Sequence, residues 1–293
     1  MIGLIDIGGT QIKFGIMDEK SKRFTFLGSV GTGTHLLDFS MAQRLFEVIR
    51  IIQEKHTIDG VAISTAGVVD PRTGTIVHAN PNIPNYTGTH LTSEVEKEFG
   101  LPSSVENDVN CALLGEIHFG GLHDVQHALM FTIGTGVGGA VLMNGTIFHG
   151  SCFSAGEVGY TTLNGKNIEE VASAQALVSR VREHYPNSEV DGHWVFEEAK
   201  KGNLVCKQAI DAFLDNLNSL IMNSVALLNP EIVILGGGIM EQKEYLEPLL
   251  LEKFQAYGNK YVHDRTKLHF ADLGNKAGIL GAYYHYQNKF LIR

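Results

Sequence analysis

The spacing of apolar residues predicts a chain in which strands and helices alternate. Runs rich in Ile, Val and Phe, interrupted by Gly, Asn or Asp, predict strands at 2–7, 12–18, 23–30, 58–64, 103–106, 128–133, 137–143, 231–235 and 267–271. Apolar residues at helical spacing predict helices most clearly at 37–55 and 204–228, and also at 107–119, 168–184, 241–256 and 276–289. This alternation is typical of an α/β architecture.

Two segments that lie far apart in the chain share one pattern. LIDIGGTQIKFGIMD (4–18) and MFTIGTGVGGAVLMN (130–144) can be superimposed without a gap. Each contains an apolar strand, Ile-Gly, a Gly/Thr turn and a second apolar strand. Glycine lets backbone approach a ligand closely, and successive N–H groups in such a turn can bind an anion. The repeat suggests two related lobes that face each other across a cleft, with two unrelated hairpins as the alternative.

A third glycine run is LGGGI (235–239), which follows a predicted strand and precedes a predicted helix. Turns that contact nucleotides often occupy this position. The run matches neither the P-loop pattern nor the dinucleotide fingerprint. Taken alone, it indicates a nucleotide site only weakly.

Polar residues gather where one predicted strand meets a helix, in SVENDVNCALLGE (104–116). Asn107 and Asp108 stand at the junction. An acid at a helix N-terminus is favoured by the helix dipole and by capping, so a simple cap is one interpretation of Asp108. The other is a general base that takes a proton from a substrate hydroxyl, with Asn107 orienting the same substrate.

Two more carboxylates follow in HGSCFSAGEVGYTTLNGKNIEE (149–170), at Glu157 and Glu169. Such a pair suggests a metal site or a glycosidase, in which two carboxylates act as acid and nucleophile or base. Carboxylates also accept hydrogen bonds from a polyhydroxyl substrate. Glycosidase chemistry gives no reason for two phosphate-type hairpins, whereas a kinase does. Solvation at the surface remains the alternative for Glu169.

Length, charge and cysteine content limit the function classes. A chain of 293 residues suits two domains or one large one. The net charge of −9 argues against a nucleic acid as the main partner. Cys111, Cys152 and Cys206 are too far apart for a Cys-x-x-Cys metal site, and their odd number does not suggest a disulfide framework. The first strand begins at Ile2, and no apolar run reaches the ~18 residues of a membrane span, so we expect no signal peptide, no membrane contact and a cytoplasmic setting.

Assembled in order, these motifs resemble a sugar kinase of the ROK family (repressors, open reading frames, kinases). The resemblance covers nearly the full length and rests on DIGGT with Lys13, GVVDPRTGTIVHANPNIPNY (67–86), END (106–108), GTGVGG (134–139), AGEVG (155–159), LGGGI and AGILGA (277–282). It implies the two-lobed, actin-like (ribonuclease H-like) ATPase fold, with a cleft between the lobes. It also implies an N-terminal lobe of residues 1–107 plus 279–293 and a C-terminal lobe of 108–278.

The resemblance implies a role for each matching residue. Asp108 would be the general base as the γ-phosphate of ATP passes to a sugar hydroxyl, with the 6-OH as the expected acceptor. Asp6 would hold Mg²⁺, through water, and Lys13 would add positive charge near the phosphates or neutralise Asp6. The phosphates would contact Gly8, Gly9, Thr10, Gly134, Thr135 and Gly136, and the adenosine Gly236, Gly237 and Gly238. The sugar would contact Asn82, Asn107, Glu157, Tyr160 and Glu169, with Glu170 as the rival of Glu169.

The chain departs from the family pattern at two places. Tyr160 stands where the glutamate loop usually ends in His, and the short LNGKN (163–167) replaces the Cys-rich zinc loop. Without these ligands there is no tetrahedral set, so we expect no structural zinc. Zinc-free members that look similar here phosphorylate β-glucosides, and a tyrosine could stack on such an aglycone. A β-glucoside such as cellobiose is therefore a candidate substrate beside glucose and N-acetylmannosamine, and fructose is less favoured.

Other function classes remain as alternatives. The repressor branch of the family carries a helix-turn-helix arm ahead of DIGGT, and only five residues precede Asp6, so we expect a kinase and not a regulator. A non-catalytic sugar sensor would need neither Asp6 nor Asp108. An acetate-type kinase or a nucleotide-hydrolysing chaperone could share the fold, but the AGEVG loop favours a sugar. The family resemblance also implies a homodimer.

Overall fold

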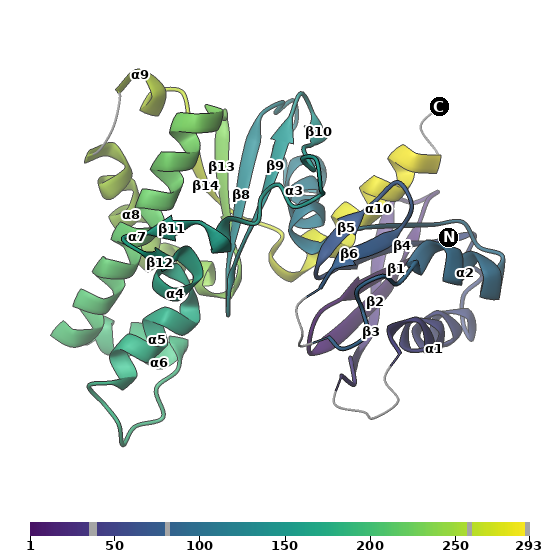
Figure 1. The fold of residues 1–293 in the computed structure, drawn as a ribbon, viewed down its shortest axis with the longest axis horizontal. Helices are drawn as coiled ribbons and strands as arrows, with labels where there is room; N and C mark the ends of the chain where they lie inside the picture. Colours follow the sequence, from purple (N-terminus) through teal and green to yellow (C-terminus); the bar gives the residue numbers. More distant parts are fainter. Residues whose placement is uncertain (35–39, 80–82, 257–259, 291–293) are drawn as a thin grey trace. The chain divides into compact units, whose positions relative to one another are not determined.

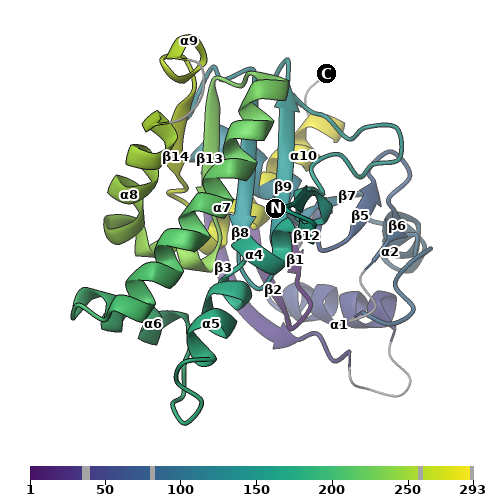
Figure 2. The ribbon, with the colours of Figure 1, turned by 60° about the vertical axis from the view of Figure 1, so that its left-hand side comes forward.

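The computed structural model describes residues 1–34, 40–79, 83–256 and 260–290. The chain folds into two compact units. The first unit contains Met1–His123, Gly150–Ser154 and Asn275–Arg293, and the second contains Asp124–His149 and Ala155–Gly274. Figures 1 and 2 draw both units in the colours of the sequence. Within the part of the chain that the structure describes, no helix is long and apolar enough to cross a membrane.

The first unit is built on a mixed sheet. Its strands, in the order β3-β2-β1-β4-β7, are β3 (Arg23–Gly31), β2 (Gln11–Asp18), β1 (Ile2–Ile7), β4 (Gly60–Thr65) and β7 (Ser103–Asn107). Strands β1, β2 and β3 are antiparallel neighbours, whereas β4 and β7 run parallel to β1. A small separate hairpin is formed by β5 (Val68–Asp70) and β6 (Thr75–His78).

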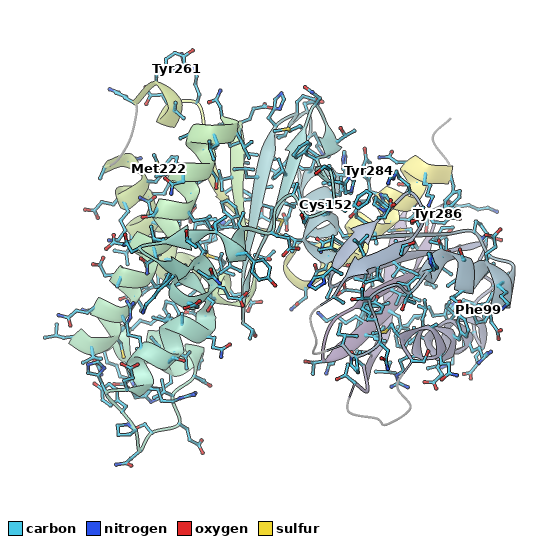
Figure 3. All side chains as sticks on the ribbon, viewed as in Figure 1. Phe99, Cys152, Met222, Tyr261, Tyr284 and Tyr286 are labelled. Carbon is cyan, nitrogen blue, oxygen red and sulfur yellow. The ribbon has the colours of Figure 1, made fainter. Side chains whose placement is uncertain are left out.

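Helices cover both faces of this sheet (Figure 1). One face packs its alternate apolar residues, Ile5 and Ile63 among them, against α1 (Met41–Gln53) and α2 (Leu91–Phe99). The other face packs against α10 (Ala277–Phe290), which also contacts α3 (Asp108–Phe119). On α10, Tyr286 lies so close to Gly60 that a Cβ there would be 2.0 Å from the tyrosine hydroxyl; Figure 3 labels this tyrosine. The helix therefore sits directly on the start of β4.

The second unit repeats the same sheet order. Its strands, in the order β10-β9-β8-β13-β14, are β10 (Thr146–Ile147), β9 (Val137–Met143), β8 (Ala128–Ile133), β13 (Ile232–Gly236) and β14 (Lys267–Phe270). Here too an antiparallel hairpin is followed by two parallel strands. The repeat predicted from the two glycine hairpins is therefore a repeat of topology. The turns differ in length, because Ile7 pairs with Ile12 but Ile133 pairs with Val137. The gapless superposition of the two segments thus holds only through the first strand.

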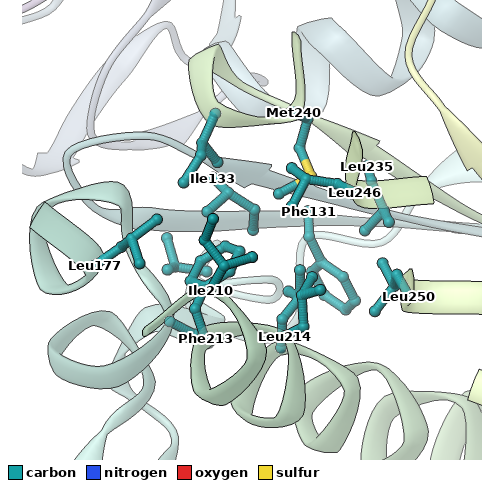
Figure 4. Close-up of a cluster of buried hydrophobic side chains, with 14 of the residues drawn as sticks. Phe131, Ile133, Leu177, Ile210, Phe213, Leu214, Leu235, Met240, Leu246 and Leu250 are labelled. Atoms are coloured by element: carbon teal, nitrogen blue, oxygen red, sulfur yellow. The ribbon is translucent and has the colours of Figure 1, made fainter. Parts of the chain in front are cut away.

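Helices of the second unit bury its apolar core against the sheet. They are α4 (Ile168–Ala172), α5 (Ala174–Arg182), α6 (Gly192–Lys200), α7 (Leu204–Leu228), α8 (Lys243–Ala256) and α9 (Lys260–His263), with the short helices η1 (Val158–Tyr160) and η2 (Gly238–Gln242). Two short strands, β11 (Thr162–Leu163) and β12 (Lys166–Asn167), also belong to this unit. Figure 4 shows Phe131 and Leu235 of the sheet packed with Phe213 of α7 and Leu250 of α8. A further short helix, η3 (Gly274–Lys276), leads back into the first unit.

Most predicted elements are present, and the differences have local causes. The helix expected over 168–184 is broken into α4 and α5 at Ser173, which is extended and buried. Its hydroxyl accepts a hydrogen bond of 3.0 Å from the Ala176 N–H and so caps α5. The short helices α2 and α6, each of nine residues, were not predicted.

The division of the chain differs from the expected lobe boundaries. Boundaries at 107/108 and 278/279 would separate α3 from the first unit, but α3 packs against α10 and belongs with it. The first unit also includes Gly150–Ser154, which the sequence placed in the second lobe. There the guanidinium of Arg72 lies 4.8 Å from the ring centroid of Phe153.

Glycines allow α3 and α10 to cross with their backbones in direct contact. A Cβ at Gly281 would lie 1.7 Å from the Cys111 carbonyl oxygen, and one at Gly115 would lie 2.2 Å from the Ala277 carbonyl oxygen. No side chain fits between the helices at either point. This contact explains why two glycines stand in helix interiors, where they weaken helix propensity by about 1 kcal/mol each.

We expect Gly281→Ala to lower the free energy of unfolding by about 3 kcal/mol, the upper end of overpacking costs, because a backbone carbonyl cannot rotate away. Urea unfolding followed by circular dichroism measures this loss. The control is Gly192→Ala in α6, where no described atom outside the adjoining residues and the backbone of α6 lies within 4 Å of the added methyl group. It should be neutral or stabilising by up to about 1 kcal/mol. Equal losses in both variants would contradict the close helix crossing.

Candidate active site

Three parallel strands of the first unit bring polar side chains to one edge of its sheet. In the strand register, Asp6 of β1 pairs with Ser64 of β4, which pairs with Glu106 of β7. The next row contains Thr65 and Asn107. Because parallel strands end at the same edge, these residues of distant sequence positions become neighbours, and Asp108 follows directly.

Asp6 is held by contacts from both neighbouring strands. The Ser64 hydroxyl donates a hydrogen bond of 2.7 Å to Asp6 Oδ1, and Lys13 stands opposite Asp6 on β2. Burial raises the pKa of Asp6 above its usual value, while the Ser64 hydrogen bond and the Lys13 charge lower it in part. Lys13 Nζ also donates to Asn275 Oδ1 at 3.2 Å. This placement fits a lysine that offsets the charge of Asp6.

The first glycine turn is fixed from β3 by Thr32, which follows that strand. The Gly8 N–H donates to the Gln11 carbonyl at 3.0 Å, and the Thr32 hydroxyl donates to the Gly8 carbonyl at 2.7 Å. The Thr32 N–H donates to the Thr10 carbonyl at 2.9 Å. At Gly9, no atom of the described residues other than the glycine and its two chain neighbours lies within 4 Å of the position a Cβ would take. The tip of the turn therefore leaves room for a ligand.

The junction between β7 and α3 orients Asp108 through Asn107. Asn107, and not Asp108, is the N-cap: its Oδ1 accepts from the N–H groups of Val109 and Asn110 at 2.9 and 3.0 Å. Its Nδ2 donates to the Gly67 carbonyl and to Asp108 Oδ1, both at 3.0 Å. Asp108 Oδ1 also accepts from the Val109 N–H at 2.9 Å. One carboxylate oxygen of Asp108 is thus fixed by two donors.

The segment expected to reach the sugar is described only in part. Asn82 lies outside the described residues. Downstream, the hydroxyls of Tyr86 and Thr65 share a hydrogen bond of 2.6 Å, and Tyr86 is buried. This hydrogen bond connects the end of the segment to the polar residues at the ends of β1, β4 and β7.

The second glycine turn is anchored by α4 and α5 of its own unit. The Gly134 carbonyl accepts from the Ala174 N–H at 2.9 Å, and Glu169 Oε2 accepts from the Val137 N–H at 3.2 Å. A Cβ at Gly136 would lie 2.2 Å from Glu169 Oε2. The turn therefore lies directly against the Glu169 carboxylate, and a side chain at Gly136 would force that carboxylate to move.

The predicted carboxylates of the second unit lie around the same turn. A Cβ on Gly159 would be 3.5 Å from Glu169 Oε2, so the loop that carries Glu157 and Tyr160 packs beside Glu169. Glu157 is exposed and directly precedes η1, and the Tyr160 side chain is 69% exposed. A cavity of about 540 Å³ lies alongside, lined among others by Thr135, Lys166, Glu169, Glu170 and Arg180. Of the two adjacent glutamates, it is Glu169 that accepts the hydrogen bond from the hairpin backbone.

The third glycine run meets the second turn. Gly237 has a φ of +94°, and a Cβ there would lie 2.4 Å from the Ile133 carbonyl oxygen. Gly236 and Gly238 flank it, between β13 and η2. Because Ile133 immediately precedes Gly134, the two glycine segments lie next to each other in the second unit.

The sequence missed three residues that organise these sites: Thr32, Ser64 and Glu106. All three are buried polar residues. Thr32 and Ser64 belong to no recognised motif, and the pairing of their strands brings them to the site. Glu106 is the first residue of the END motif, in which the sequence predicted roles only for Asn107 and Asp108. Among the described residues, no group of three His, Cys, Asp or Glu side chains could hold a metal ion. The absence of a zinc site stays a prediction.

A sequence model of the ROK family matches residues 2–289 of the chain. The chain belongs to the ROK family. An uncharacterized protein of Clostridium perfringens is 42% identical to it over 99% of both chains. A beta-glucoside kinase of Klebsiella pneumoniae is 30% identical over 99% of this chain and 97% of its own. A solved ROK family glucokinase from Streptomyces griseus, in complex with glucose and AMPPNP, covers 96% of this chain and 97% of its own, with a TM-score of 0.81 and 26% identity.

Membership in the ROK family confirms the resemblance drawn from the ordered motifs. The similarity in fold also confirms the predicted α/β, actin-like class with two lobes, in agreement with the matching sheet order of the two units. The roles of individual residues stay predictions, which the geometry of the strand edge and the glycine turns makes specific enough to test.

We expect Asp6→Asn to raise the melting temperature at pH 7–8 by a few degrees. The pKa of Asp6 is raised by burial, so its ionised form destabilises the folded state above that pKa. The amide oxygen can still accept from Ser64. The advantage should shrink as the pH falls through the pKa of Asp6, because the native carboxyl is then neutral too.

Scanning calorimetry at several pH values measures this difference. The control is Asp18→Asn, because hydrogen bonds from the Ser21 hydroxyl and the Lys20 N–H lower the pKa of Asp18. That variant should not raise the melting temperature. A gap between Asp6→Asn and wild type that widens toward low pH would contradict the role of burial.

Proposed function

We propose that this ROK family chain is an ATP-dependent sugar kinase that transfers the γ-phosphate to a hydroxyl, first of all the 6-OH, of a hexose or β-glucoside. The observation that carries the proposal is that the Asp108 carboxylate is held by two hydrogen bonds at the end of the sheet where Asp6 also lies. A base and a candidate metal ligand lie in one unit, next to a glycine turn with an open tip.

The glycine turns would hold the nucleotide. Gly8, Gly9 and Thr10 in the first unit, and Gly134, Thr135 and Gly136 in the second, would present N–H and hydroxyl donors to the phosphates. Gly236, Gly237 and Gly238 would lie against the adenosine. These nine positions belong to three turns, and the last two turns are in contact within the second unit.

Asp6 fits the expected Mg²⁺ ligand. It is a carboxylate next to a hydroxyl, a hard oxygen donor, and Mg²⁺ sites with phosphates use one or two carboxylates and several waters. When bound, the ion would neutralise charge on the phosphates. Ser64 would keep the Asp6 carboxylate oriented, and Lys13 would balance its charge.

Asp108 would act as the general base. Its carboxylate would accept the proton of the sugar hydroxyl as that oxygen forms a bond to the γ-phosphorus and the bond to the β,γ-bridging oxygen breaks, releasing ADP. Phosphoryl transfer depends mainly on positioning and charge neutralisation. The hydrogen bonds from Asn107 and Val109 to Asp108 Oδ1 support this role, because they limit rotation of the carboxylate.

The sugar would contact the five residues that the family resemblance implies, which are Asn82, Asn107, Glu157, Tyr160 and Glu169. The exposed ring of Tyr160 supports a β-glucoside such as cellobiose, whose aglycone it would cover, as does the similarity to the Klebsiella pneumoniae beta-glucoside kinase. Glucose and N-acetylmannosamine are the next candidates.

We also propose that the chain forms a homodimer and acts in the cytoplasm.

We expect Asp108→Asn to leave sugar affinity broadly unchanged while kcat falls by roughly two or more orders of magnitude, because an amide cannot accept the proton. Steady-state turnover and calorimetric sugar binding measure the two effects separately. The control is Asp191→Asn, at another helix N-terminus, where Asp191 accepts from the Trp194 N–H at 2.7 Å. It should keep full turnover. Near-normal turnover of Asp108→Asn would remove Asp108 from the base role.

We expect Glu157→Ala to raise the sugar KM about tenfold or more, because a sugar hydroxyl left without its acceptor loses about 1.5–3 kcal/mol of charged hydrogen bonding. The KM for ATP should change little. Initial-rate kinetics with each substrate varied in turn measure this difference. Glu189→Ala, at an exposed position of the same unit, should change neither constant. An unchanged sugar KM in Glu157→Ala would mean that the sugar binds elsewhere.

A further inference from the structure

Glu106 is a buried carboxylate, directly before Asn107 and Asp108. It lies in the row of Asp6 and Ser64, and its side chain is 1% exposed. Oε1 accepts hydrogen bonds from the Asn107 N–H at 2.8 Å and from Asn110 Nδ2 at 3.0 Å. Oε2 lies 4.0 Å from Nδ1 of His285 on α10.

Burial of a carboxylate is costly unless it is hydrogen-bonded and paired. The cost is higher here, because Asp6 and Asp108 are also carboxylates at this strand edge. An apolar residue at the end of β7 would avoid the cost and could fill the same space. The contacts of Glu106 must therefore supply something that an apolar residue would not.

Those contacts hold the first turn of α3 in place. Glu106 holds the backbone of Asn107 and the side chain of Asn110, which is 4% exposed. The Asn107 amide in turn donates to Asp108 Oδ1 at 3.0 Å. Glu106 thus holds Asn107, and Asn107 in turn determines the orientation of the Asp108 carboxylate.

We infer that Glu106 is a positioning residue for Asp108, acting through Asn107 and Asn110. This inference rests on the proposed function, in which Asp108 is the base. Glu106 touches neither substrate; it sets the orientation of the group that does. Loss of its hydrogen bonds should let the Asn107 N-cap and the Asp108 carboxylate shift, and a misplacement of about 1 Å can cost about 10²-fold in rate.

The test compares two substitutions of Glu106. Glu106→Leu removes both acceptors and should lower kcat about 10- to 100-fold, with the sugar KM changed less than about threefold. Glu106→Gln keeps a carbonyl oxygen that can accept from Asn107 and Asn110, so it should restore most of the lost kcat. Rates are expressed per folded molecule, measured by circular dichroism. An unchanged kcat in Glu106→Leu, or no rescue by Gln, would overturn the inference.

Glu116→Leu is the matched control. Glu116 is a second buried carboxylate, but it lies within α3 itself, directly after Gly115, where α3 contacts α10. Its substitution should lower the melting temperature without lowering kcat per folded molecule. If Glu116→Leu loses as much kcat as Glu106→Leu, the effect of Glu106 is general loss of helix stability, and the positioning role is wrong.

A double substitution separates this inference from the proposed function. If Glu106 acts through Asp108, Glu106→Leu should lower the residual rate little further in an Asp108→Asn background, because the orientation of an inactive amide no longer matters. Additive losses would overturn the positioning role alone. If Asp108→Asn by itself keeps near-normal turnover, the proposed base role fails instead.

Discussion

The close crossing of α3 and α10 is the constraint on which the first unit depends. The backbones of the two helices are in direct contact at Gly281 and Gly115, and this contact fixes the distance between the helices and their relative rotation. A third glycine, Gly278, extends this packing to the site: a Cβ there would lie 3.3 Å from the Ser64 hydroxyl oxygen and 3.6 Å from Asp6 Oδ1. The sheet face beneath α10 accepts this approach because β4 presents the small residues Ala62 and Ser64. The N-terminus of α3, and with it Asp108, is thereby fixed to the strand edge that holds Asp6.

The second unit uses close packing at its glycine turns in a similar way. Gly237 meets the backbone of Ile133 at a distance that excludes any side chain, and Gly136 lies directly against the Glu169 carboxylate. In both units a strand-turn-strand hairpin is thus held from outside, by Thr32 in one and by Glu169 in the other. A turn held in this way can present backbone donors to a phosphate without first being ordered, which lowers the entropic cost of binding.

The sequence predicted those parts of the molecule that local pattern determines. The bounds of α7 agree at both ends, because a long helix has many apolar positions and because Asn203 and Asn229 cap it. The order of strands and the glycine hairpins were likewise visible. The break at Ser173 was not, since one residue of extended backbone leaves the apolar period almost intact.

The candidate site was found from the sequence only where motifs occur. Thr32 and Ser64 reach the site through strand pairing, and strand pairing cannot be read from one chain. Glu106 stands beside Asn107 in the END motif, but its contacts with Asn107 and Asn110 arise only in the folded chain. The sequence offered a simple cap as one interpretation of Asp108, whereas the contacts of Asn107 show that Asn107 is the N-cap of α3.

The most direct test of the proposed function is sugar-dependent phosphoryl transfer by the unaltered chain. ADP release with Mg-ATP would be followed against cellobiose, glucose, N-acetylmannosamine, mannose and fructose, and the phosphate on the product would be located by phosphorus NMR. We predict that at least one sugar, with cellobiose and glucose first, gives a turnover of about 1–100 s⁻¹ and a phosphate ester on its 6-oxygen. ATP binding without sugar-dependent ADP release from any of them would contradict the proposal and would favour a sugar sensor.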